Sequence, residues 1–187
     1  MTLNNSSFYG TKTMNFNKEE IELTMVMNVK RQHRFPVIPQ PKSDNYIGRL
    51  TYEQDFNNQG KHGWGELGTD NMSYAKQPFN IGDTIKLEGT NNYVQITDIV
   101  VKRIQDFTEK DIEREGKNYF KGVSQLRASH LAVLVERYEI EWNDYIGQDN
   151  IPTYGYHLNT WVWEVHFKPV RDKENERVDK LNRRKVL

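Results

Sequence analysis

The densest basic cluster in the body of the chain consists of Lys30, Arg31, His33 and Arg34. It lies where a predicted helix gives way to residues 36–41, a segment that three prolines favour as extended. Lysine and arginine neutralise phosphate groups, and each such contact makes binding dependent on salt. We therefore predict that this cluster binds RNA or a nucleotide.

Two aromatic residues of the following region, Trp64 and Tyr74, are further candidates for ligand contact. An aromatic ring that stacks on an unpaired base contributes roughly 1–3 kcal/mol. For Trp64 a second interpretation is equally supported, in which the indole anchors the loop to the core. Residues 45–80 are rich in Gly, Asn, Asp and Gln, so we expect a long loop or a weak hairpin there, with a possible strand at 46–52.

The elements that must position these residues begin with a helix over about 17–30. Asn17 can accept a hydrogen bond from a free amide of the first turn, and Glu20 follows three residues later. Phe16 and Ile21 flank them in the positions of a hydrophobic staple. These signals agree on where the helix starts.

Hydrophobic periodicity and turn residues indicate the remaining elements. They are an antiparallel hairpin of 84–88 with 93–104, a short capped helix over 108–116, an amphipathic helix over 131–146 and a half-buried strand over 161–168. Strands followed by helices and a closing strand predict the α+β class. We favour a small mixed β-barrel flanked by helices.

Five segments, in this order and spacing, resemble the ASCH-domain proteins of the PUA-like superfamily, particularly phage and prophage versions. The segments are 30–34 running into 39–41, then 78–87, 94–116, 142–147 and 159–168. The first is similar to the family's Gly-Arg-Lys-Thr-Gln-Thr-Arg-Arg, which also runs into Pro-Gln-Pro. The family's glycine is missing, because Asn28 and Val29 precede Lys30 here.

The resemblance implies a PUA-like barrel with a cleft between the first helix and the sheet, where such folds bind RNA or a nucleotide. Some bacterial members are amidohydrolases that act on acetylated cytidine through a Lys, a Thr and a Glu. By position Lys30 and Glu115 match the lysine and the glutamate, whereas His33 replaces the threonine. These three residues are therefore the candidate catalytic groups of an altered amidohydrolase, the first alternative to simple binding.

The same resemblance sets the domain organisation that we expect. Residues 1–16 form a loose arm, residues 17–170 form one ASCH/PUA-like domain with a long loop at about 45–80, and residues 171–187 form a charged tail. A second alternative function follows from the unusual loop and tail. In that case the chain is a phage accessory protein that binds a host protein.

Composition excludes several classes of function. The 187 residues carry 26 basic and 26 acidic side chains, which rules out a globally basic nucleic-acid binder but leaves room for a local basic patch. Without cysteine there are no disulfides or thiolate ligands, and the five histidines lack zinc-site spacing, so we expect no metal and no cofactor. No signal peptide or run of about 20 apolar residues is evident, so we expect a cytoplasmic protein without membrane contact, either a monomer or a homodimer.

Overall fold

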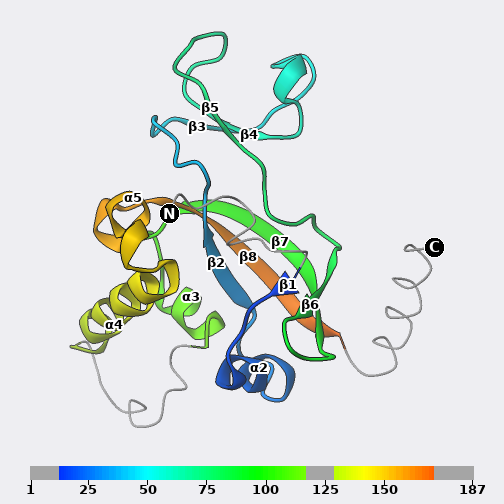
Figure 1. Cartoon of the computed structure of the whole chain (residues 1–187), viewed down its shortest axis with the longest axis vertical. Helices are drawn as coiled ribbons and strands as arrows, with labels where there is room; N and C mark the ends of the chain where they lie inside the picture. The colour runs from blue at the N-terminus through cyan, green and yellow to red at the C-terminus, as the bar shows by residue number, and fades with distance from the viewer. Residues whose placement is uncertain (1–12, 117–128, 171–187) are drawn as a thin grey trace, which may run out of the picture.

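The main sheet has five strands in the order β1-β6-β7-β8-β2, shown in a computed structural model that describes residues 13–116 and 129–170 (Figure 1). The strands are β1 (Thr13–Met14), β2 (Gln32–Pro36), β6 (Thr84–Leu87), β7 (Tyr93–Arg103) and β8 (Trp161–Val170). β1 runs parallel to β6, and the other neighbours are antiparallel. The β6–β7 pair confirms the predicted hairpin.

The last strand, β8, lies inside the sheet between β7 and β2 and is buried on both faces over most of its length. Trp163, Val165 and Phe167 join the larger apolar core on one face. Val162 joins a second core on the opposite face, and Glu164 on that face is only 1% exposed. The predicted alternation is correct, but the polar positions do not all face solvent, because helices cover this side of the sheet.

Four α-helices accompany the sheet in the described part of the chain. They are α2 (Lys18–Met25), α3 (Glu109–Arg114), α4 (Ser129–Ile146) and the single turn α5 (Ile151–Tyr154). α4 packs with α5 through Tyr138, Trp142 and Tyr154 to build the second core. α2 lies apart from α4 and α5, at the end of the sheet where β1 ends and β2 begins (Figure 1).

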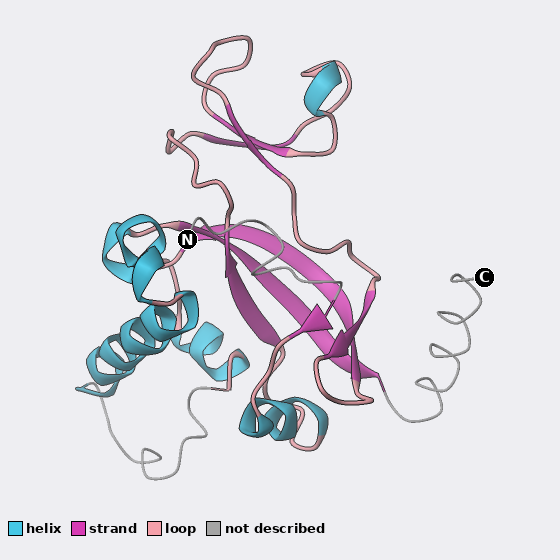
Figure 2. Ribbon diagram, in the orientation of Figure 1, coloured by secondary structure: helices cyan, strands magenta, loops and turns pink. Residues whose placement is uncertain are grey.

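Residues 45–80 do not form one irregular loop. They fold into a three-stranded antiparallel sheet of β3 (Tyr46–Arg49), β4 (His62–Trp64) and β5 (Ser73–Ala75), which projects from the main sheet (Figure 2). Short strands separated by glycine-rich turns carry a weak sequence signal, so only the first of them was expected. The sheet is tied to the main core by Trp64, which is fully buried.

Local signals explain where the helices start. Asn17 and Glu20 form a reciprocal capping box on α2, and Thr108 and Asp111 do the same on α3, as predicted. α2 nevertheless ends at Met25, earlier than the predicted 30. The chain turns sharply after it, because Asn28 takes a left-handed φ of 54°.

These elements bear on the expected fold class and on the expected N-terminal arm. The class is α+β, as predicted, but the two sheets are open and the described residues form no closed barrel. Residues 13–16, which we expected in the loose arm, belong to the fold, with Met14 and Phe16 in the core. Residues 1–12 and the tail 171–187 lie outside the described residues.

Within the described part of the chain, no helix has the length and apolar character needed to cross a membrane.

Candidate ligand cavity between α2 and α4

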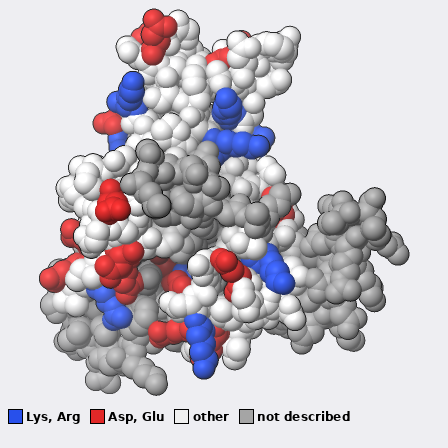
Figure 3. Space-filling model, in the orientation of Figure 1, with Lys and Arg blue, Asp and Glu red and all other residues white. Residues whose placement is uncertain are grey.

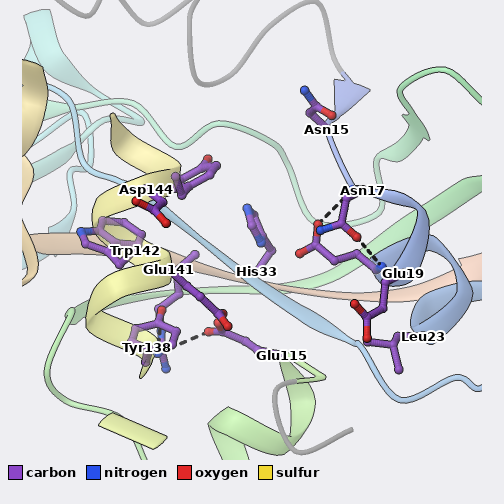
Figure 4. A pocket seen from close by; sticks show the side chains of 13 residues that line it. Asn15, Asn17, Glu19, Leu23, His33, Glu115, Tyr138, Glu141, Trp142 and Asp144 are labelled. Carbon is purple, nitrogen blue, oxygen red and sulfur yellow. Dashed lines mark hydrogen bonds and ion pairs between the residues drawn. The ribbon is translucent and has the colours of Figure 1, made fainter. Parts of the chain in front are cut away.

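A cavity of about 350 Å³ opens between α2, β2 and α4 (Figure 4). The first helix and its approach contribute Asn15, Asn17, Glu19, Glu20 and Leu23. The long helix α4 contributes Tyr138, Glu141, Trp142, Asp144 and Tyr145. His33 and Arg34 of β2, together with Glu115 at the end of α3, form the floor. The volume lies within the range of small-molecule sites, about 300–1,000 Å³.

The lining of this cavity is acidic. Five carboxylates face it, from Glu19, Glu20, Glu115, Glu141 and Asp144. Among the described residues that line it, the basic ones are Arg34 and His33. A cavity with this balance favours neutral or cationic ligand groups that donate hydrogen bonds, and it repels phosphate.

His33 stands in the middle of the cavity, between side chains of α4 and those of α2 (Figure 4). Its ring meets three aromatic rings edge to face, at centroid distances of 4.8 Å from Phe35, 5.3 Å from Tyr145 and 5.4 Å from Phe16. Because Tyr145 comes from α4 and Phe16 precedes α2, the imidazole connects the two walls. Its position is therefore fixed by packing.

Lys30 lies behind the cavity wall and is completely buried. Its Nζ forms an ion pair with Glu20 Oε1 at 3.1 Å, donates to the Glu115 main-chain carbonyl at 3.3 Å, and lies 5.0 Å from the centre of the Phe16 ring. Burial would raise the pKa of Glu20, but the charges of Lys30 and His33 and the Asn17 N–H outweigh it and lower this pKa to about 2. Lys30 thus positions two groups of the cavity wall, the Glu20 carboxylate and the Glu115 main-chain carbonyl.

Arg34 is the centre of a buried network of charges behind the floor. Its Nε and Nη2 donate to Glu164 Oε2 at 3.1 and 2.6 Å, and its Nη1 lies 3.3 Å from Glu115 Oε1. The Nη1 atom also donates to the Tyr138 hydroxyl at 3.3 Å. Burial alone would lower the pKa of Arg34, but Glu115, Tyr138 and Glu164 raise it, so the guanidinium stays charged.

Glu164 divides its two oxygens between opposite sides of this network. Oε2 accepts from Arg34, whereas Oε1 accepts from Lys102 Nζ at 2.9 Å and contacts His166 Nε2 at 3.1 Å. Burial would raise the pKa of Glu164, but the His166 bond, the Arg34 charge and the Lys102 bond lower it to about 2. The carboxylate is therefore ionised across the physiological range of pH.

The structure separates residues that the sequence places together. Of the three candidate catalytic residues, His33 and Glu115 line the cavity and Lys30 lies behind it. Of the predicted ligand contacts, Arg34 also lines the cavity, but its guanidinium is occupied by Glu164 and Glu115. Arg31 lies outside it, as an exposed residue directly before β2.

The two aromatic candidates lie in the projecting sheet rather than in the cavity. The Trp64 indole is 0% exposed and packs against Trp161 and Trp163, which favours the interpretation as an anchor over base stacking. Tyr74 is half-buried on β5, where a hydrogen bond with Asp55 raises its pKa. Neither ring reaches the cavity described above.

Sequence reasoning missed the carboxylates of α4. Glu141 and Asp144 lie on either side of Trp142 in the sequence. The prediction for this helix rested on its hydrophobic stripe alone and did not include them. A usable signal was present, because Glu141 and Tyr145 lie four residues apart and so share one face of the helix with Tyr138. The sequence thus indicates a helix face that is both acidic and aromatic.

Comparison with known proteins gave no match to a family model, to a curated protein or to a solved structure. Within residues 13–116 and 129–170, no group of three His, Asp or Glu side chains is arranged to hold a metal ion.

Proposed function

We propose that the cavity binds a nucleobase with an exocyclic amino group, such as cytosine, presented by a nucleoside or by an unpaired position of RNA. The observation that carries this proposal is the combination of carboxylates with aromatic rings around one cavity of suitable size. A carboxylate accepts a hydrogen bond from the amino group of cytosine, and an aromatic ring provides a surface for the base. His33 and Tyr145 supply the rings, and Glu141 supplies the acceptor.

The acidic lining restricts which part of a nucleotide the cavity can hold. A phosphate in this cavity would meet Glu19, Glu20 and Asp144 without an unengaged arginine or lysine among the described lining residues. A base or nucleoside that reaches the cavity with its phosphates left outside avoids this repulsion. The proposal therefore places the base, and not the phosphate, between α2 and α4.

The resemblance of five segments to ASCH-domain proteins supports the same assignment. The family's cleft lies between its first helix and its sheet, which corresponds in position to the cavity between α2 and β2. Membership in that family, and a PUA-like relationship of the main sheet, are parts of this proposal. They rest on residues 30–41, 78–87, 94–116, 142–147 and 159–168.

Binding of cytidine, uridine and cytidine 5′-monophosphate, measured by titration calorimetry, tests the proposal. Cytidine should bind tightest, because uridine lacks the amino group and the monophosphate adds charge. Glu141→Gln should weaken cytidine binding by about tenfold, the discrimination given by one lost charged hydrogen bond. Glu136→Gln is the matched control, since Glu136 is exposed on the same helix and outside the cavity lining. Equal affinity for cytidine and uridine would refute the proposal.

A second candidate is hydrolysis of an acylated amino group on such a base, in which water adds to the amide carbonyl and the amine departs. The specific observation is that His33 and Glu115, two of the three candidate catalytic residues, line the same cavity. Lys30 then has a positioning role through Glu20 and the Glu115 carbonyl. Release of acetate from N4-acetylcytidine, abolished in Glu115→Gln, is the required result. Absence of turnover by a protein that binds cytidine would leave binding as the function.

A further inference from the structure

A second concave surface lies on the other side of the buried network, along β7 and β8. We call it the β7–β8 groove and define it by its basic residues Arg31, Lys102, Arg114, His166 and Lys168. Its volume is about 570 Å³. None of these five residues lines the cavity between α2 and α4, so the groove is a separate site.

The pleat of the sheet explains why these residues gather. Successive side chains of a strand alternate between faces, so His166 and Lys168 share one face of β8 with Glu164. Lys102, on the neighbouring strand β7, lies on the same face of the sheet, and its Nζ donates to Glu164 Oε1 at 2.9 Å. Two strands thus align basic groups along a common floor.

Two arginines from other elements complete the groove. The main-chain N–H of Arg31 donates to the carbonyl of Arg114 at 2.6 Å, which ties the stretch before β2 to the end of α3. The Arg31 Nε donates to the Asn28 carbonyl at 2.8 Å, so the guanidinium is oriented by the turn after α2. Arginine presents several donors in a planar fork that matches a phosphate group.

The acidic groups of the groove do not cancel this charge at its surface. The side chains of Asp111 and Glu164 are 6% and 1% exposed, and both already face Arg34 and Lys102. Asp98 is the exposed carboxylate among the described groove residues, and it accepts the main-chain N–H of Ile99. Arg31 and Lys168, by contrast, are exposed.

Basic side chains are concentrated in the groove. On the face drawn in Figure 3, side chains of both charges are interspersed over the described residues. In the β7–β8 groove, basic groups from four separate segments converge over buried, neutralised carboxylates. An anion that enters it finds donors on several sides.

We propose that the β7–β8 groove binds phosphate groups, carried either by a single-stranded nucleic acid or by a free nucleotide or polyphosphate. The chemistry is the same in both cases: arginine and lysine donors pair with phosphate oxygens, and bound counterions are released. The proposal does not depend on a base in the α2–α4 cavity. A ligand could occupy the groove through its backbone alone.

Short fluorescent oligouridylate is the appropriate probe, because uracil lacks the amino group proposed for the other site. Its binding should weaken by about tenfold or more in Arg114→Gln/Lys168→Gln, and the slope of log affinity against log salt should fall by roughly 1.4, about 0.7 for each lost contact. Lys42→Gln/Lys76→Gln is the control, since both lysines are exposed, lie outside the groove and remove the same charge. Melting temperatures of both variants check that each is folded.

The outcomes separate the sources of phosphate. Displacement of oligouridylate by pyrophosphate at matched phosphate concentration indicates a free phosphate ligand, and retention indicates a nucleic-acid backbone; both support the groove. Equal weakening in the two double variants, or no binding of oligouridylate or pyrophosphate by the wild-type protein at low salt, overturns the proposal. A protein that binds oligouridylate but not cytidine would keep the groove and remove the function proposed for the cavity.

Discussion

Arg34 and Glu164 are 130 residues apart in the chain, yet two nitrogens of the arginine donate to one oxygen of the glutamate. Both side chains are about 1% exposed, and they lie between the acidic cavity and the basic groove. Removal of one member of a buried pair leaves the other charge in a poor environment, which commonly costs about 3–5 kcal/mol.

Arg34→Met should lower the free energy of unfolding by about 3–5 kcal/mol, because Glu164 and Glu115 lose their shared buried partner. Arg137→Met is the control, since the pair of Arg137 with Glu141 is partly exposed and should contribute at most about 1 kcal/mol. Urea denaturation at neutral pH measures both. Similar losses in the two variants would show that the buried network is not a main source of stability.

Acid should destabilise the protein as Glu164 takes up a proton. The pKa of this carboxyl is lowered from an ordinary value of 4.5 to about 2, so its contribution is complete above pH 4.5 and is lost as pH falls toward 2. The shift corresponds to a loss on the order of 3 kcal/mol in the free energy of unfolding. Urea denaturation from pH 7 to pH 2 should give a shallower dependence for Glu164→Gln than for wild type. Parallel profiles would contradict the assignment.

Lys30 and Glu20 should be energetically coupled. Their ion pair at 3.1 Å joins a completely buried amine to a carboxylate of the cavity wall. In a double-mutant cycle, Lys30→Met and Glu20→Gln should show a coupling energy of about 1–3 kcal/mol in stability. A coupling near zero would mean that Lys30 is held mainly by its contact with Phe16 and the Glu115 carbonyl.

Gly116→Ala should destabilise the protein more than Gly82→Ala. Both glycines have positive φ, 78° and 90°, so each substitution carries a strain of about 1–2 kcal/mol. A Cβ on Gly116 would also lie 3.0 Å from Leu23 Cδ1 and 3.4 Å from Lys30 Cβ, whereas one on Gly82 meets no atom within 4 Å. The additional cost at Gly116 should be about 1 kcal/mol or more in urea denaturation. Equal losses would show that Leu23 moves aside freely.

Local signals were sufficient for the helix starts and for the β6–β7 hairpin. Asn17 and Glu20 occupy their capping positions within four residues of sequence, so a short window contains all the necessary information. The same is true of Thr108 and Asp111 on α3. Elements that are set by residues close together in sequence can therefore be predicted from the sequence.

The basic cluster could not be interpreted in this way. Its alternation of buried and exposed residues follows from β2 and the two residues before it. The burial of Lys30 and Arg34 depends on the Glu115 main-chain carbonyl and the Glu164 carboxylate, which lie 85 and 130 residues away in sequence. Without those partners, a run of basic residues indicates a solvent-facing surface. The structure instead divides the run, with Lys30 and Arg34 in the interior, His33 in the cavity and Arg31 in the β7–β8 groove.

The position of β8 also bears on how the chain folds during its synthesis. Because β8 lies inside the main sheet, β2 has no strand partner among the described elements until residues 161–170 have left the ribosome. Contacts between such distant segments form slowly, since a long loop must close first. The apolar side of β2 therefore stays uncovered while residues 37–160 are synthesised, and the edge of β7 stays unpaired while residues 104–160 are synthesised. A chaperone that covers strand edges would protect the nascent protein during this period.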